Sequence, residues 1–99
     1  MAKFTISNKA VEDLSNIWNY TFDTWSESQA DKYYSILLES CQDIANDIVS
    51  GKHYPEIDKN IFGFKSGQHI IFYTSLPKGK ILIIRILHSS MDLRNRLSE

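Results

Sequence analysis

The stretch that decides the fold is Lys80-Ile81-Leu82-Ile83-Ile84-Arg85-Ile86-Leu87-His88, near the end of a chain of 99 residues. It is rich in β-branched residues and free of Gly and Pro, which predicts a strand over Lys80–His88. Side chains of a strand alternate between the two faces of a sheet. The alternation assigns these side chains to two faces, one with Leu82, Ile84 and Ile86, and the other with Ile81, Ile83, Leu87 and the single charged residue Arg85. A strand that is apolar on both faces is typical of a sheet that is covered on both sides.

Two further β-rich runs precede this strand, over residues 61–65 and 68–75. They are joined at Ser66-Gly67, and the second leads through residues 76–79 into Lys80–His88. Such short connections that contain glycine predict an antiparallel meander. Residues 53–60, with Pro55 and several charges, are expected to form a loop.

The first part of the chain predicts a short strand and a helix. Residues 3–6 alternate in the manner of a strand, and Ser7 is suited to cap a helix over residues 8–25 with its hydroxyl. Apolar residues recur along this helix at the spacing that places them on one face.

A second helix is expected to follow at once. Ser26 and Gln29 have the spacing of a capping box, and the apolar pattern continues to about residue 50. Gly51 is suited to the left-handed position after a helix end. The short junction between the two helices predicts an antiparallel hairpin.

These elements predict one domain over residues 1–99 with an α+β fold. The expected order is strand, helix, helix and three strands, with the helical hairpin packed on one face of a mainly antiparallel four-stranded sheet. Residues 3–6 are expected at the edge of this sheet, and residues 91–97 are expected to form a short terminal helix.

The hairpin can cover only one face of the sheet, so the other face of the strand Lys80–His88 predicts a binding surface for a protein partner. Tyr20 and Ile36 also lie outside the apolar arcs of their helices. Arg85 in the middle of the strand would need an acidic partner if it were buried, either from the binding partner or from Asp92. The residues expected at this surface are Tyr20, Ile36, Leu38, Ile81, Ile83, Arg85 and Leu87.

Composition narrows the possible functions. The formal net charge is −1, which is unlike that of a nucleic-acid-binding enzyme, although residues 1–50 are acidic and residues 51–99 are basic. Cys41 is the only cysteine, so no internal disulfide is possible. The sequence has no hydrophobic run of membrane-spanning length and no visible signal peptide, which favours the cytoplasm.

Motifs for cofactor and metal chemistry are absent from the sequence. No Cys and His residues have the spacing of zinc ligands, and neither a phosphate-binding glycine loop nor a nucleophile elbow occurs. We therefore expect no metal and no cofactor.

Three stretches of the chain resemble the RelE/ParE toxin superfamily and, within it, the ParE-type toxins of bacterial type II toxin–antitoxin pairs. The first runs through the two helices, the second lies in the predicted sheet, and the third ends the last strand. They are Asp13-Leu14 with Ile17-Trp18-Asn19-Tyr20-Thr21, Trp25 and Gln29-Ala30-Asp31-Lys32-Tyr33-Tyr34; His69-Ile70-Ile71-Phe72-Tyr73; and Ile84-Arg85-Ile86-Leu87-His88-Ser89-Ser90-Met91-Asp92. Ser90 departs from the pattern, since Arg is common there.

The resemblance implies a toxin that poisons DNA gyrase by binding rather than by catalysis, and that is neutralised by a ParD-like antitoxin in a hetero-oligomer. The apolar surface described above would then bind the antitoxin, and DNA would be contacted only indirectly, through the antitoxin. Residues of the tail that the resemblance implies for target binding are Met91, Asp92, Arg94 and Arg96.

Two alternatives stay open at this point. RelE relatives cut mRNA on the ribosome, and the best available set for that chemistry here is Lys65, Arg85 and His88. The low charge and the lack of a RelE-like tyrosine in the tail disfavour this alternative. A relative that binds its antitoxin without being toxic would have the same sequence features.

Overall fold

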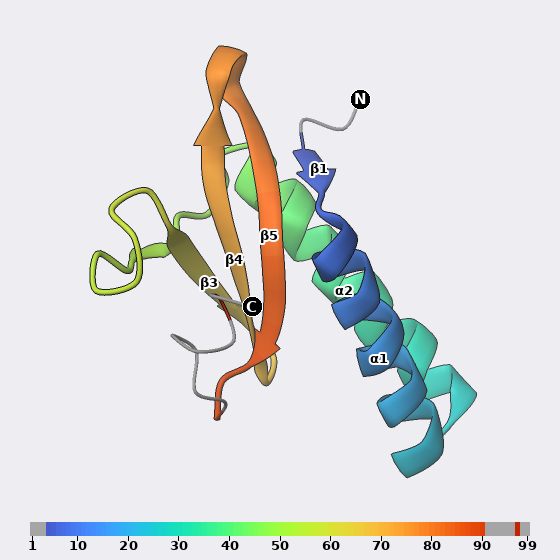
Figure 1. The fold of residues 1–99 in the computed structure, drawn as a ribbon. Helices are drawn as coiled ribbons and strands as arrows, with labels where there is room; N and C mark the ends of the chain where they lie inside the picture. Colours follow the sequence, from blue (N-terminus) through green and yellow to red (C-terminus); the bar gives the residue numbers. More distant parts are fainter. Residues whose placement is uncertain (1–3, 91–96, 98–99) are drawn as a thin grey trace.

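The computed structural model describes residues 4–90 and Leu97. Within these residues the chain forms two α-helices, a short 3₁₀ turn (Pro77–Gly79) and one mixed sheet of five strands (Figure 1). The helices and strands are β1 (Phe4–Ile6), α1 (Asn8–Thr24), α2 (Glu27–Ala45), β2 (Lys52–His53), β3 (Phe62–Ser66), β4 (His69–Leu76) and β5 (Lys80–His88).

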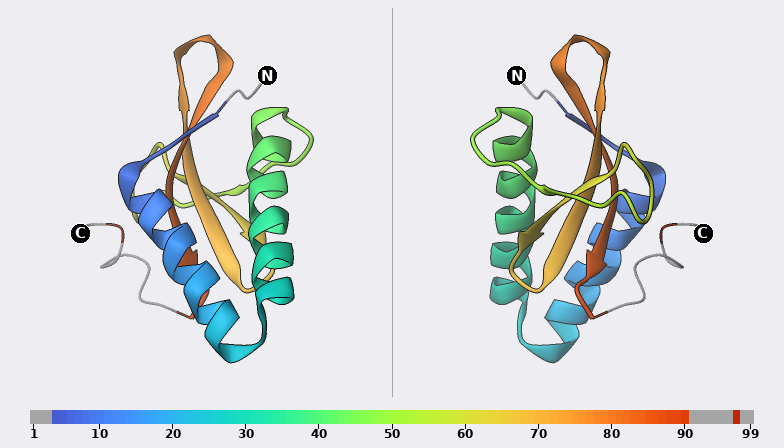
Figure 2. Two further views of the ribbon diagram at one scale, coloured as in Figure 1. Left: turned by 90° about the vertical axis from the view of Figure 1, so that its right-hand side faces the viewer. Right: turned by 90° about the vertical axis from the view of Figure 1, so that its left-hand side faces the viewer.

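Both helices lie on the same face of the sheet, as the α+β prediction required (Figures 1 and 2). The hydroxyl of Ser7 accepts the backbone N–H of Ala10 and caps α1, and that of Ser26 accepts the N–H of Gln29 and caps α2. The predicted α1 and its cap are therefore confirmed, with Trp25 as the residue that ends the helix.

Helix α2 ends at Ala45, about five residues earlier than the sequence indicated. Asp47 adopts the left-handed conformation with φ 61°, and its N–H binds the carbonyl of Ile44. The N–H of Ile48 binds the carbonyl of Asp43, which completes a Schellman motif. The assignment of Gly51 to this position was wrong, because Asp47 takes it without being a glycine.

Gly51 instead allows close packing beside β3. Its N–H binds the Tyr73 hydroxyl at 2.8 Å, and a Cβ there would lie 2.8 Å from the Gly63 carbonyl oxygen. A side chain at this position would therefore displace backbone.

The strands lie in the order β1-β5-β4-β3-β2, with β1 parallel to β5 and all other pairs antiparallel. The edge position of β1 and the meander are confirmed, with β3 and β4 each shifted by one residue. The sequence missed β2, which pairs with β3 and of which His53 lies in the segment expected to be a loop. The described residues therefore form five strands rather than four.

A β-bulge interrupts the pairing of β4 with β5. Phe72 pairs with Arg85 and Tyr73 pairs with Ile83, so Ile84 has no counterpart on β4. The extra residue shifts the alternation of side chains along β5. Ile83 consequently packs on the helix side and Leu87 on the opposite side, so the prediction that they share one face was wrong.

Two apolar cores result, one on each face of the sheet. The core on the helix side gathers buried residues of α1, α2, β4 and β5, namely Ala10, Leu14, Leu37, Cys41, Ile44, Ile71, Tyr73, Ile83 and Ile86. On the opposite face, the segment between β2 and β3 covers a smaller core. That core contains Ile70, Phe72 and Leu87, with Tyr54, Ile57, Ile61 and Leu97 packed against it.

The chain therefore covers the second sheet face itself, where the sequence predicted an exposed partner surface. Most of the predicted terminal helix lies outside the described residues, except for Leu97, which is helical and half-buried.

Candidate functional site

An ion pair between Asp13 and Arg85 holds α1 against the C-terminal half of β5. The Asp13 carboxylate accepts two hydrogen bonds from Arg85, one from Nε at 2.8 Å and one from Nη2 at 3.0 Å. The guanidinium therefore binds the carboxylate at two points. The same carboxylate accepts the backbone N–H of Ile86 at 3.0 Å. The acidic partner that the sequence required for Arg85 is thus Asp13, which the sequence analysis had not considered.

Ser7 holds the bulge from the other side. Its hydroxyl donates to the Ile84 carbonyl at 2.6 Å, and its N–H donates to the Ile83 carbonyl at 2.9 Å. The cap of α1 and the bulge of β5 are therefore one hydrogen-bonded unit, in which the carbonyls of Ile83 and Ile84 both have a partner.

A cleft opens between the base of the helical hairpin and the adjoining ends of β4 and β5. It consists of two adjacent hollows of about 520 and 490 Å³ that share Tyr20, His69 and His88. The first extends between the hairpin and the β3–β4 turn, and the second follows the outer side of β5 to Asp13 and Arg85. We call the two hollows together the hairpin cleft.

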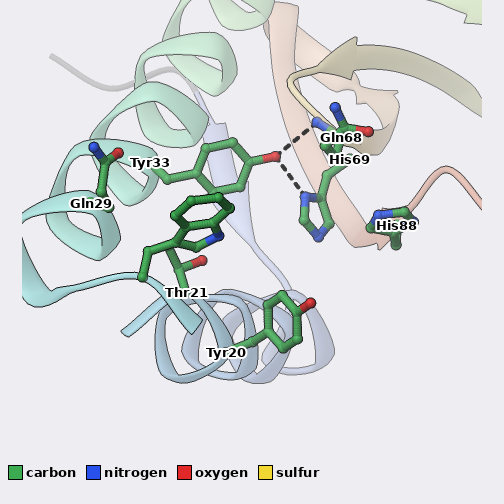
Figure 3. Close-up of a pocket in the computed structure, with 8 residues that line it drawn as sticks. Tyr20, Thr21, Gln29, Tyr33, Gln68, His69 and His88 are labelled. Atoms are coloured by element: carbon green, nitrogen blue, oxygen red, sulfur yellow. Dashed lines mark hydrogen bonds between the residues drawn. The ribbon is translucent and has the colours of Figure 1, made fainter. Parts of the chain in front are cut away.

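Tyr33 joins α2 to the β3–β4 turn at the wall of the cleft (Figure 3). Its hydroxyl accepts the N–H of Gln68 at 3.0 Å and lies 2.7 Å from Nδ1 of His69. Gly67 in the turn has φ 61°, and a Cβ there would lie 2.7 Å from the Tyr33 ring. Only glycine fits both the turn and this contact.

His69 is half-buried, and its pKa is lowered to about 4, first by burial and then by the nearby His88, against an opposing effect of Asp13. It is therefore neutral at physiological pH. The imidazole rings of His69 and His88 lie 5.3 Å apart, edge to face. Burial raises the pKa of Tyr33, which remains a neutral hydrogen-bonding group.

The rim of the cleft is aromatic and open to solvent. Tyr20 is 69% exposed and Trp25 is 72% exposed. Large exposed aromatic side chains beside a hollow are typical of a protein-binding surface.

The predicted antitoxin-binding residues do not form one surface. Ile83 and Leu87 are 0% and 2% exposed and lie in different cores, so their expected exposure was wrong. Leu38 and Ile81 are half-buried and pack against the core on the helix side. Tyr20 and Ile36 are exposed as expected, and three residues of the whole set, Tyr20, Arg85 and Leu87, line the hairpin cleft.

The structure does not gather the residues of the endonuclease alternative. Lys65 pairs with Ile70, and paired residues share a sheet face. Ile70 and Phe72, the partner of Arg85, both belong to the core on the face away from the helices, whereas His88 pairs with His69, which contacts Tyr33 on α2. Met91, Asp92, Arg94 and Arg96, predicted for target binding, lie outside the described residues.

Among residues 4–90 and Leu97, no three His, Cys, Asp or Glu side chains come close enough to hold a metal ion. Cys41 is buried, and burial raises its pKa to about 12. Within the same part of the chain, no helix is long and apolar enough to cross a membrane.

Sequence reasoning missed three residues of the site, Asp13, Tyr33 and His69. All three lie in the stretches that carried the resemblance, which is the signal that could have singled them out. Tyr33 and Cys41 follow the same helical apolar pattern, so the pattern alone did not separate a cleft residue from a core residue.

Comparisons with known proteins agree with this architecture. A chain of the chromosomal ParDE toxin–antitoxin system from P. aeruginosa has the same fold, with a TM-score of 0.74 at 16% identity over 89% of this chain and 96% of that one. Toxin ParE1 of Mycobacterium tuberculosis is 29% identical over 97% of this chain and 98% of its own length. Toxin ParE1 of Caulobacter vibrioides is 31% identical over 98% of this chain and 99% of its own.

The fold and these relatives define the class as a small α+β toxin of a toxin–antitoxin pair. The family model for the ParE toxin of the type II toxin–antitoxin system parDE matches residues 4–93. The chain therefore belongs to the ParE toxin family.

Proposed function

We propose that this toxin inhibits DNA gyrase in the cytoplasm and is neutralised by a ParD-like antitoxin, in both cases by binding rather than by catalysis. The observation that carries the proposal is the match to the ParE toxin family over residues 4–93. The antitoxin follows from the same match and from the ParDE system that shares the fold. DNA would be reached only through the antitoxin in the hetero-oligomer.

The arrangement of charged groups supports binding over ribonuclease chemistry. Arg85 is engaged by Asp13, and Lys65 shares a sheet face with Arg85 but not with His88. His69 is neutral because of its low pKa. With a net charge of −1, the chain also lacks the excess of cations that binding to ribosomal RNA requires.

Pulse labelling in growing bacteria tests the proposal. Induction of the toxin is expected to stop thymidine incorporation first, while methionine incorporation continues in the same culture. Co-expression with the product of the adjacent short reading frame should restore DNA synthesis. Lys65→Ala is a matched control, since its side chain is exposed and has no role in this proposal.

Two results would contradict the proposal. If the wild-type toxin stopped methionine incorporation at once and the Lys65→Ala variant did not, the endonuclease alternative would be established. Growth without any arrest, together with stable binding to the antitoxin, would establish the non-toxic alternative.

A further inference from the structure

The hairpin cleft contains two imidazole groups whose hydrogen bonds fix which nitrogen carries the proton. His69 and His88 pair directly across β4 and β5, and both line the two hollows of the cleft. Each uses Nδ1 in a hydrogen bond within the chain. Among the described residues, neither Nε2 atom has a hydrogen-bond partner.

For His69 the tautomer follows from the Tyr33 hydroxyl, which has one proton to donate. Since this oxygen already accepts the N–H of Gln68, its own proton goes either to Nδ1 of His69 at 2.7 Å or to the Ser66 carbonyl at 3.4 Å. A distance of 3.4 Å is long for an O–H···O bond, so the proton goes to His69. Nδ1 is then an acceptor, and Nε2 of the neutral ring carries the hydrogen.

For His88 the tautomer follows from a backbone donor. The N–H of Ser90 donates to Nδ1 at 3.1 Å, and the Ser90 hydroxyl lies 2.7 Å from the same atom. A backbone N–H cannot accept, so Nδ1 must be the acceptor and Nε2 the donor. The cleft therefore has two Nε2–H donors with fixed hydrogens and, within the part of the chain that the structure describes, no acceptor.

The surroundings define what these donors bind. Nearby are the exposed aromatic rings of Tyr20 and Trp25, and the cation in the cleft, Arg85, already binds the Asp13 carboxylate. Two N–H donors suit a singly charged carboxylate, whereas a nucleic-acid backbone needs several cations. Aromatic rings around such a polar centre are typical of a protein interface.

We infer that the hairpin cleft is a carboxylate-binding site in which His69 and His88 donate through Nε2 to an acidic side chain of the antitoxin, while Tyr20 and Trp25 cover its apolar neighbours. The inference rests on the proposed function for the identity of the partner. It adds the location of the contact and its chemistry.

The first arm of the test uses the free toxin, labelled with ¹⁵N at its histidines. Before any addition, the ring nitrogens of His69 and His88 should show the Nε2–H tautomer near neutral pH. Sodium acetate is then titrated at constant ionic strength and is expected to shift both Nε2 resonances with saturation. Either ring in the Nδ1–H form, or acetate causing no saturable shift, would overturn the inference. Saturation by inorganic phosphate but not by acetate would also overturn it.

The second arm uses the antitoxin encoded beside the toxin. His88→Leu removes the donor and is expected to weaken binding about tenfold or more, as for loss of a hydrogen bond to a charged group. His88→Gln keeps an N–H at the end of its side chain and should bind within a few-fold of wild type. His53→Leu on β2 is the matched control, with circular dichroism to confirm folding of every variant.

A double-mutant cycle then identifies the acidic partner. Each Asp or Glu of the antitoxin is changed in turn to its amide. At one position this change should weaken binding to the wild-type toxin but not to the His88→Leu toxin. If the antitoxin binds wild type and His88→Leu equally, the inference fails and the proposed function stands. If the antitoxin does not bind at all, the partner assigned here fails with the proposed function, and the acetate titration still decides whether the carboxylate site exists.

Discussion

Asp13 on α1 and Arg85 on β5, 72 residues apart in sequence, form a two-point ion pair whose carboxylate also binds the N–H of Ile86. Both side chains are 11% exposed, so the pair is nearly dry. The contact ties the middle of α1 to β5 just after the bulge. It thereby fixes one wall of the hairpin cleft relative to the other.

Asp13→Asn should lower the free energy of unfolding by about 3 kcal/mol, because the charge of Arg85 would lose a nearly buried two-point ion pair. The double variant Asp13→Leu with Arg85→Met should lose less than the single variant, since no charge is then buried. Urea denaturation followed by circular dichroism measures both. Glu12→Gln, an exposed neighbour, should change stability by less than about 0.5 kcal/mol. Equal effects of Glu12→Gln and Asp13→Asn would argue against a stabilising role for the pair.

Ser7→Ala should cost more stability than Ser26→Ala, although both remove a helix cap. Loss of a cap costs about 1 kcal/mol, and Ser7 also donates to the Ile84 carbonyl in the bulge. The additional bond predicts about 1 kcal/mol more for Ser7→Ala. Thermal and urea unfolding of the two variants give the comparison. If they unfold alike, the hydroxyl does not stabilise the bulge.

Gly67→Ala and Gly79→Ala form a second matched pair. Both glycines have positive φ, 61° and 72°, so alanine should cost about 1 kcal/mol at either position from the backbone alone. At Gly67 the new methyl would also lie 2.7 Å from the Tyr33 ring, whereas nothing lies within 4 Å at Gly79. Gly67→Ala should therefore be the more destabilised variant and should also perturb the His69 resonances. A larger loss at Gly79 would contradict the close contact of Tyr33 with the turn.

The stability of the fold should decrease in mild acid because of His69. Its pKa in the folded chain, about 4, lies below the ordinary value of 6.5. As the pH falls from about 6.5 towards 4, the unfolded chain binds a proton there and the folded chain does not, so stability is lost in this window and is constant above it. Urea midpoints between pH 7 and pH 5 should therefore decline less for His69→Gln than for wild type.

His88 and Asp13 act on the same titration in opposite directions. His88 lowers the pKa of His69, so His88→Gln should raise that pKa and narrow the pH range over which stability is lost. NMR titration of the His69 ring measures the pKa directly. A His69 ring that titrates near 6.5 in the folded wild type would contradict this account.

Local patterns predicted most of the fold because they depend on neighbours in sequence. Ser7 has a hydroxyl placed to bind the first turn, and Lys80–His88 has apolar side chains on both faces, so both the cap and the strand were predicted correctly. The end of α2 was predicted wrongly, because Asp47 adopts a left-handed conformation that the sequence pattern assigns to glycine. Strand β2 is only two residues long and depends entirely on pairing with β3.

The site was harder to predict because it depends on a shift in register. Strict alternation placed Ile83 and Leu87 on one face, and one unpaired residue, Ile84, separates them. The bulge has its partners, Ser7 and Asp13, about 70 residues away, and no spacing rule connects them. For the same reason Arg85 was expected to be paired with the antitoxin or with Asp92.

The central claim, a toxin that inhibits gyrase by binding and is neutralised by its antitoxin, is tested most directly by a supercoiling assay. Relaxed plasmid, ATP and purified gyrase are incubated with the toxin alone and with the toxin premixed with the antitoxin. The account predicts that the toxin prevents supercoiling in a dose-dependent manner and that an equimolar antitoxin restores it. Full supercoiling in the presence of an excess of folded toxin would contradict the claim.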